Sequence, residues 1–373
     1  MLARIPCVIM RGGTSKGIFF KKEDLPPEGP ERDRVLMKIF GSGDSLQIDG
    51  LGGGQPHTSK TMIVWKSDKQ DIDIEYTFGQ VGVTEKFIDW TGNCGNLTSA
   101  VAPFAIDEKI VKAKEPYTLV KMYNTNTKKR IDAIVPVEGG VTKYEGDYWI
   151  DGVPNPGARI DLKWYSPGGS ITGKLLPTGN PKDKIDTGME VIECSIVDAS
   201  NLTVFVRAKD VGLTGRELPG EIDKETELKL ERIRSKTAEV VGIVKNAKEA
   251  TIRSPYFPFI AVVAENQDYR TSEGKFVKKE EYYILARLYS MQKMHHAYPV
   301  TGAICTGAAA KIPGSIVNEF FGDKGEKVII GHPKGVIDVT VEVTPAGELV
   351  YIKSVTIGRT ARRLMAGFAY YVP

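Results

Sequence analysis

The chain has 373 residues, of which 41% are hydrophobic and 26% are charged, proportions typical of a soluble globular protein with about two domains. Its formal net charge is only +3 and the two signs are interspersed, so no basic stripe supports nucleic-acid binding. No run approaches the roughly 18 apolar residues of a membrane helix, and the apolar run 5–10 is too short for a secretion signal. We therefore expect a cytoplasmic protein with no nucleic-acid partner and no membrane partner.

The cysteines lie far apart in the sequence. They are Cys7, Cys94, Cys194 and Cys305, and none belongs to a CxxC pair. This spacing disfavours a zinc knuckle or a thioredoxin-type site, so we predict no metal site. A disulfide framework is equally disfavoured in a chain of this length.

Short β-like segments alternate with glycine-rich turns in the first half of the chain. The predicted strands are 5–10, 17–20, 61–66, 72–78, 117–123 and 130–137. Residues 97–109 predict a buried helix, because apolar residues recur at helical spacing and Pro103 lies near the first turn, where proline is tolerated. Further on, residues 224–243 predict an amphipathic helix with one charged face.

Two weak internal matches occur in the same order in the two halves of the chain. The segment 15–25 aligns with 201–211, each after an apolar strand, and Thr91-Gly92 ahead of Cys94 aligns with Thr301-Gly302 ahead of Cys305. A small-residue helix follows in both cases of the second match. We infer two related α+β halves, 1–187 and 188–373, with the C-terminal tail free to pack back on the first. A ligand between the two helix N-termini would occupy a natural anion site.

A lysine and a cysteine stand out by their settings. Lys60 closes Thr58-Ser59-Lys60, shortly after three consecutive glycines, and Cys94 lies between two Gly/Asn pairs ahead of the predicted helix. A cysteine at a helix N-terminus ionises more easily than a free thiol, because unpaired N–H groups and the helix dipole favour negative charge. If the two groups meet across a pocket, they form a proton-transfer pair for acidic carbon substrates.

Several segments resemble the PrpF-type isomerases, relatives of diaminopimelate epimerase. They are RGGTSKG at 11–17, DGLGGG with TSK at 49–60, GNCGNLTSAVAPFAI at 92–106, PTGN at 177–180, YPVTGAICTGAAAKIPG at 298–314, GHPKG at 331–335 and GRTARRLMAG at 358–367. The likeness covers nearly the whole chain in the right order. GNCGN and GRTARRLMAG are its most specific parts.

The resemblance implies an α+β fold of two similar domains, each a β-sheet wrapped around a central helix, with the active site in the cleft between them. It also implies cofactor-independent isomerisation of an unsaturated di- or tricarboxylic acid such as 2-methylaconitate or aconitate. The lysine and cysteine of the family match Lys60 and Cys94. Diaminopimelate epimerase uses two opposed cysteines, whereas the repeat alignment places Ile304, not Cys305, opposite Cys94.

The substrate carboxylates need hydrogen-bond donors. From the position of their motifs, the candidates are Arg11, Ser15, Ser59, Asn93, Gly95 and Asn96 in the first half and Thr301, Gly302 and His332 in the second. Arginine offers a bidentate contact, and the others offer side-chain or backbone donors beside the proposed pair.

Two other functions stay open. One is a two-thiol racemase or epimerase for an amino or hydroxy acid, acting through Cys94 and Cys305. The other is a non-catalytic accessory of an aconitase-like enzyme. The sequence leaves the preferred acid, the reaction direction and a homo-oligomeric state open.

Overall fold

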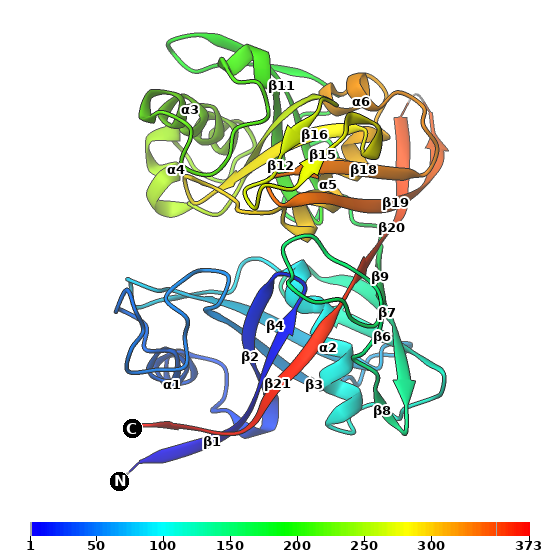
Figure 1. Cartoon of the computed structure of the whole chain (residues 1–373). Helices are drawn as coiled ribbons and strands as arrows, with labels where there is room; N and C mark the ends of the chain where they lie inside the picture. The colour runs from blue at the N-terminus through cyan, green and yellow to red at the C-terminus, as the bar shows by residue number, and fades with distance from the viewer. Residues whose placement is uncertain (1, 348) are drawn as a thin grey trace. The chain divides into compact units, whose positions relative to one another are not determined.

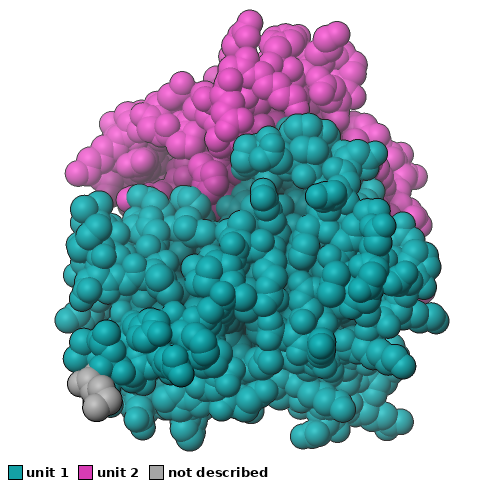
Figure 2. All heavy atoms as spheres, turned by 60° about the horizontal axis from the view of Figure 1, so that its bottom comes forward, with its two compact units in different colours: residues 1–163, 358–373 teal, residues 164–357 magenta. Residues whose placement is uncertain are grey.

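The computed structural model describes residues 2–347 and 349–373. Two compact units make up the chain: unit 1, Met1–Lys163 with Gly358–Pro373, and unit 2, Trp164–Ile357, coloured separately in Figure 2. The boundary predicted after residue 187 therefore lies inside unit 2. The reason is strand pairing, because β10 (Asp183–Asp186) pairs with β11 (Val191–Ala199) of unit 2.

Unit 1 contains a mixed β-sheet with the strand order β21-β1-β2-β3-β4-β6-β7. Its strands are β1 (Ala3–Gly12), β2 (Ser15–Lys21), β3 (Lys60–Lys66), β4 (Ile74–Val81), β6 (Tyr117–Asn124), β7 (Lys129–Glu138) and β21 (Ala361–Tyr371), with the short β5 (Ile88–Asp89) and β8 (Val141–Thr142) and, at its end, β9 (Ile160–Tyr165). The pairs β2–β3 and β4–β6 are parallel and the others antiparallel. The six predicted strands are all present. Five of them extend beyond the predicted range at one end or both, and the strand predicted at 72–78 is shifted to 74–81.

A buried helix, α2 (Gly95–Asp107), lies at the centre of unit 1 (Figure 1). Every residue from Gly95 to Ile106 is buried, and the helix contacts β1, β2, β3, β7, β8 and β21. The predicted helix began two residues late, so Pro103 lies in the third turn and not near the first as we expected. The helix is held by this burial rather than by propensity, since proline removes one ladder hydrogen bond.

A second helix, α1 (Pro30–Phe40), covers the other face of the same sheet. Its Leu36 and Phe40 pack with Ile18, Phe20 and Ile63 in one core cluster. Because side chains alternate along a strand, Ile63 faces α1, while Lys60 and Met62 of β3 face the side on which α2 lies.

Unit 2 repeats the arrangement around α5 (Val300–Ala310), which is buried along its whole length. Its further strands are β12 (Asn201–Arg207), β13 (Phe259–Glu265), β16 (Ile284–Ser290), β18 (Lys327–His332), β19 (Gly335–Ala346) and β20 (Leu349–Arg359), with the short β14 (Tyr269–Arg270), β15 (Phe276–Val277) and β17 (Lys293–Met294). The other helices are α3 (Lys224–Val240), α4 (Ala247–Arg253) and α6 (Ile316–Phe321). The predicted helix 224–243 is thus α3, ending three residues earlier.

The strand pairings confirm that the two halves are related. In unit 1, β1–β2, β2–β3, β3–β4, β4–β6 and β6–β7 are antiparallel, parallel, antiparallel, parallel and antiparallel. In unit 2, β11–β12, β12–β13, β13–β16, β16–β18 and β18–β19 follow the same sequence. The aligned segments 15–25 and 201–211 both form a seven-residue strand followed by a 3-10 turn. The fold is α+β, with two similar sheets that each surround a helix.

The C-terminal strand β21 returns to unit 1. It pairs antiparallel with β1 over its whole length (Figure 1), and Ala369 is buried opposite Ile5. The chain therefore needs its last strand to complete the sheet of its first unit. In the part of the chain that the structure describes, no helix is long and apolar enough to cross a membrane.

Candidate functional site

Three sequence motifs meet at the N-terminal end of α2. A Cβ on Gly12 would lie 2.6 Å from the carbonyl oxygen of Asn96, and a Cβ on Gly17 would lie 2.6 Å from the carbonyl oxygen of Lys60. At both positions any side chain larger than hydrogen would push backbone apart. The glycines of RGGTSKG therefore let the β1–β2 turn touch both the helix that carries Cys94 and the strand that begins at Lys60.

Lys60 is the first residue of β3 and is buried, with only 7% of its surface exposed. It lies directly across the ladder from Gln80 of β4, and its Nζ donates a short hydrogen bond to Gln80 Oε1. The Nζ also lies 5.2 Å from the centre of the Phe78 ring, near enough for a cation–π contact. A lysine held this way has little of the freedom of a surface lysine.

The pKa of Lys60 lies below the ordinary 10.5, because burial disfavours the charged ammonium. An electrostatic interaction with Cys94 acts in the opposite direction, which places the two groups within electrostatic reach of each other. His57, in the loop before β3, also has a lowered pKa, from burial and from the charges of Lys60 and Lys16. A lysine with a depressed pKa is closer to serving as a neutral base.

Cys94 is the N-cap residue of α2, in agreement with its predicted place at a helix N-terminus, and is 8% exposed. Its thiol donates toward the Ser15 hydroxyl, with Sγ and Oγ 3.9 Å apart. The first helical hydrogen bond runs from Thr98 N to the carbonyl oxygen of Cys94, so the N–H groups of Gly95, Asn96 and Leu97 are not used by the helix ladder. These N–H groups and the helix dipole give the start of α2 a partial positive charge beside the thiol.

The side chains of Asn93 and Asn96 are engaged within the protein. Asn93 Nδ2 donates to the Tyr76 hydroxyl at 3.1 Å, and its Oδ1 accepts from Thr98. Asn96 clamps the β1–β2 turn by accepting from the backbone of Thr14 and donating to its hydroxyl. Both asparagines thus fix the geometry around Cys94. The buried Tyr76, whose pKa is raised by burial, and Thr98 belong to this network, although no sequence pattern pointed to either residue.

The side chains of two other predicted binding residues are also hydrogen-bonded within the protein. Ser59 is fully buried, and its hydroxyl donates to Gln47 Oε1 at 2.5 Å. Arg11 Nη1 donates to the carbonyl oxygens of Gly13 and Thr360 at 3.0 and 3.1 Å. Burial, with the charge of Arg362 as a smaller cause, lowers the pKa of Arg11 to about 10. Ser59 shapes the loop before Lys60, and Arg11 ties the β1–β2 turn to the strand connection at Thr360.

The predicted residues of the second half all lie in unit 2. Thr301 and Gly302 belong to the first turn of α5, not to a segment ahead of the helix as we expected, because Pro299 is the N-cap. His332 ends β18 and is 2% exposed, and its Nδ1 accepts from the backbone of Lys334 at 3.2 Å. That these three residues bind the same ligand as Lys60 and Cys94 stays a prediction.

Cys305 has surroundings unlike those of Cys94. It is the sixth residue of α5 and completely buried, and its thiol donates to the carbonyl oxygen of Val197 at 3.3 Å. Burial raises the pKa of this thiol to about 12. A thiol that is both sealed and hard to ionise is a poor proton-transfer group.

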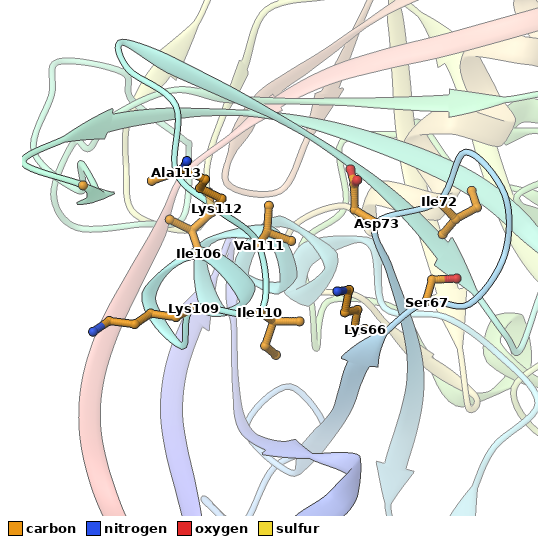
Figure 3. Close-up of a pocket in the computed structure, with 11 residues that line it drawn as sticks. Lys66, Ser67, Ile72, Asp73, Ile106, Lys109, Ile110, Val111, Lys112 and Ala113 are labelled. Atoms are coloured by element: carbon orange, nitrogen blue, oxygen red, sulfur yellow. The ribbon is translucent and has the colours of Figure 1, made fainter.

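A pocket of about 700 Å³ opens in unit 1 near the C-terminal end of α2, lined by Ile106, Ile110 and Val111 and by Lys66 and Asp73 among others (Figure 3). None of the predicted site residues lines it. Since α2 is 13 residues long, about 20 Å of helix separates this pocket from Cys94. Among the described residues, no group of three or more His, Cys, Asp or Glu side chains is placed to hold a metal ion.

Comparison with known sequences gives matches over nearly the whole chain. A family model described as PrpF protein matches residues 2–373. The 3-methylitaconate isomerase of Eubacterium barkeri is 47% identical over 372 residues, which are 98% of this chain and 97% of that protein. The 2-methyl-aconitate isomerase of Shewanella oneidensis is 39% identical over 383 residues, covering 98% and 96% of the two chains.

Comparison with solved structures agrees. A crystal structure of a methylitaconate-delta-isomerase matches with a TM-score of 0.84 and 46% identity, over 99% of this chain and 96% of that one. A hydroxyproline epimerase from Agrobacterium vitis matches with a TM-score of 0.55 at 11% identity, over 98% and 92% of the two chains. At that identity the second match speaks for the fold alone, and it confirms the predicted diaminopimelate epimerase-like fold.

Proposed function

Since the chain belongs to the PrpF family and is an isomerase, we propose that it shifts a proton and a double bond in an unsaturated di- or tricarboxylic acid. The relatives named above support the substrate class, because their names specify methylitaconate and methylaconitate. The observation that carries the proposal is a buried lysine of lowered pKa beside a cysteine at a helix N-terminus.

The proposed reaction begins with removal of an allylic proton. The C–H bond next to a carboxylate breaks, its proton moves to the neutral amine of Lys60, and the electron pair spreads into a dienolate. Such a proton is only weakly acidic, so the base must be held in position and the anion stabilised. The depressed pKa of Lys60 favours the neutral form that this step needs.

Return of a proton to the other end of the dienolate completes the shift. The proton comes from the Lys60 ammonium, or from the Cys94 thiol, and in the second case the Lys60 ammonium then returns a proton to the Cys94 thiolate. A new C–H bond forms, and the double bond takes its new place or geometry. The electron pair of the broken C–H bond is used to form the new C–H bond after the double bond has moved, so no oxidant or reductant is needed. Ser15, which receives the thiol hydrogen bond, would keep Cys94 oriented.

The substrate carboxylates would bind at the start of α2. The N–H groups of Gly95, Asn96 and Leu97 lie ahead of the first helical hydrogen bond and form the kind of site that holds carboxylates at helix N-termini. The side chains of Asn93 and Asn96 would support this site indirectly, since each is already hydrogen-bonded within the protein.

Deuterium wash-in from heavy water tests the function directly. We expect the enzyme to exchange a carbon-bound proton in one or more of 3-methylitaconate, 2-methylaconitate and oxalomesaconate, with the best substrate identifying the preferred acid. Lys60→Met should reduce exchange by about 10²–10⁴-fold, because it removes the proposed general base.

The matched control is Lys66→Met, since Lys66 is exposed at the other end of β3. It should exchange deuterium at the wild-type rate. Absence of exchange with every acid would favour a non-catalytic accessory, and full activity in Lys60→Met would remove the lysine from the mechanism.

A further inference from the structure

The neighbouring carbonyl groups fix the orientation of the Gln80 side-chain amide. Its Nε2 lies 3.0 Å from the carbonyl oxygens of both Pro56 and Ser59 and 3.4 Å from that of Val81. Carbonyl oxygens only accept hydrogen bonds, so the NH₂ group must face them. The Oε1 is therefore the atom presented to Lys60.

The position of Gln80 follows from the strand register. Gln80 and Lys60 are directly opposite in the antiparallel β3–β4 ladder, and side chains of opposite residues project from the same face of a sheet. Gln80 is itself 7% exposed. The Lys60 amine thus meets a fixed, buried acceptor that belongs to its own strand pair.

From this geometry we propose that Gln80 is the positioning residue of Lys60: it takes one N–H of the amine, so that the lone pair of neutral Lys60 points away from Gln80 and toward the substrate. The inference rests on the proposed role of Lys60 as the base. An amine without this contact would rotate freely about its last carbon bond, and its lone pair would be aimed at the reacting carbon only part of the time.

The charge of the side chain at position 80 would also affect the protonation of Lys60. The groups that face the amine are the Cys94 thiol from α2, the His57 imidazole from the loop before β3 and the Phe78 ring from β4. A neutral amide holds the amine without adding charge, so burial still keeps the pKa of Lys60 below its ordinary value. A carboxylate at position 80 would instead stabilise the charged ammonium form and raise the pKa of Lys60.

The test uses two nearly isosteric changes with opposite effects. In Gln80→Glu, we expect the acidic limb of the pH profile of kcat/KM to move up by about one pH unit or more, because an opposite charge within a few ångströms favours the ammonium. In Gln80→Leu, the limb should move down, and kcat should fall while KM changes little. Gln55→Glu makes the same charge change at an exposed site in the loop before β3. It should leave the acidic limb of the pH profile of kcat/KM unchanged.

A direct readout separates this inference from the proposed function. The Lys60 side chain, labelled with ¹³C at Cε and assigned with Lys60→Met, is titrated by NMR in each full-length variant without substrate. Opposite shifts of the Lys60 titration in Gln80→Glu and Gln80→Leu support the inference. A titration unmoved in both variants overturns it, even if Lys60 proves to be the base. Shifted titrations with unshifted deuterium exchange would uphold the contact but contradict Lys60 as the base.

Discussion

Cys94 and Cys305 show how position decides the chemistry of one residue type. Cys94 caps a helix beside a hydroxyl and a buried amine, whereas Cys305 lies inside a helix and donates to a carbonyl oxygen. The sequence distinguished them only through the repeat alignment, which placed Ile304 opposite Cys94. The structure makes Pro299 the N-cap of α5, so Cys305 lies about a turn and a half inside that helix, whereas Cys94 is itself the N-cap of α2.

Substitution of the two cysteines tests this contrast. Cys305→Ser should keep deuterium exchange near the wild-type rate, because the hydroxyl can still donate to Val197. Cys94→Ser should lose about 10²–10⁴-fold, as expected when an acid/base group is weakened. The measurement is the exchange rate of each variant with the best acid. Loss of activity in Cys305→Ser at unchanged stability would instead support the alternative function, a two-thiol racemase.

The proposed catalytic residues could be predicted from the sequence, whereas the residues that hydrogen-bond to the site residues could not. Lys60 and Cys94 stand in motifs with visible glycines and asparagines, and the structure brings both to one end of α2. Gln80 and Tyr76 carry no such signal, since each lies in an ordinary strand and gains its role only through register. Ser59 was predicted as a binder, yet its hydroxyl is bound to Gln47, a partner that no local pattern indicates.

At the scale of elements, the glycine-rich β1–β2 turn packs against its neighbours through backbone atoms, because its glycines have no side chains. It lies between the start of α2 and the start of β3, and Gly17 touches both, since a Cβ there would lie 2.6 Å from Leu97 Cδ1 and from the carbonyl oxygen of Lys60. The backbone is therefore the contact surface that sets the separation of the two catalytic candidates.

A methyl group at this contact should disturb the site. Gly17→Ala is expected to push β3 away from the turn, which costs about 1–3 kcal/mol of overpacking and reduces activity by as much as about 10²-fold through misplacement of Lys60. Deuterium exchange and thermal unfolding measure the two effects. Gly367→Ala is the matched control, because a Cβ there has only an ordinary contact, 3.4 Å from Met365 Sδ.

Equal activity in the two glycine variants would contradict this role of the turn. The strands on both sides of this turn could be predicted from the sequence, because their apolar runs are short and bounded by glycine.

Helix α1 was not predicted, although Pro30 at the first helical position and the apolar residues Val35, Leu36 and Ile39 at helical spacing are typical of a helix.

At the scale of the whole molecule, the chain is a duplicated unit whose last strand belongs to the first copy. The internal matches predicted the duplication, and the common order of parallel and antiparallel pairs confirms it. The boundary was harder to predict, because it depends on pairings over long sequence distances. Strand β10 joins β11, and β21 joins β1 across more than three hundred residues.

Neighbouring substitutions on β21 test its place in unit 1. Ala369→Asp puts a charge among Ile5, Phe20 and Leu36, and an uncompensated buried charge should cost more than about 3 kcal/mol. Tyr370→Asp, at a site 58% exposed, should change stability by less than about 0.5 kcal/mol.

The measurement is hydrogen exchange resolved by segment, since a chain of two units need not unfold in one step. In Ala369→Asp, we expect faster exchange in β1 and β2 and unchanged exchange in β16 and β18 of unit 2. Unchanged protection of β1 would show that β21 is not needed for the sheet of unit 1.

The central claim is that the amine of Lys60 and the thiol of Cys94 act on one bound acid, and a crystal structure with a saturated tricarboxylate tests it most directly. We predict that both atoms lie within about 3.5 Å of the carbon chain of the acid, on opposite faces, with a carboxylate on the first N–H groups of α2. An acid bound elsewhere, or one that only one of the two groups can reach, would contradict the account.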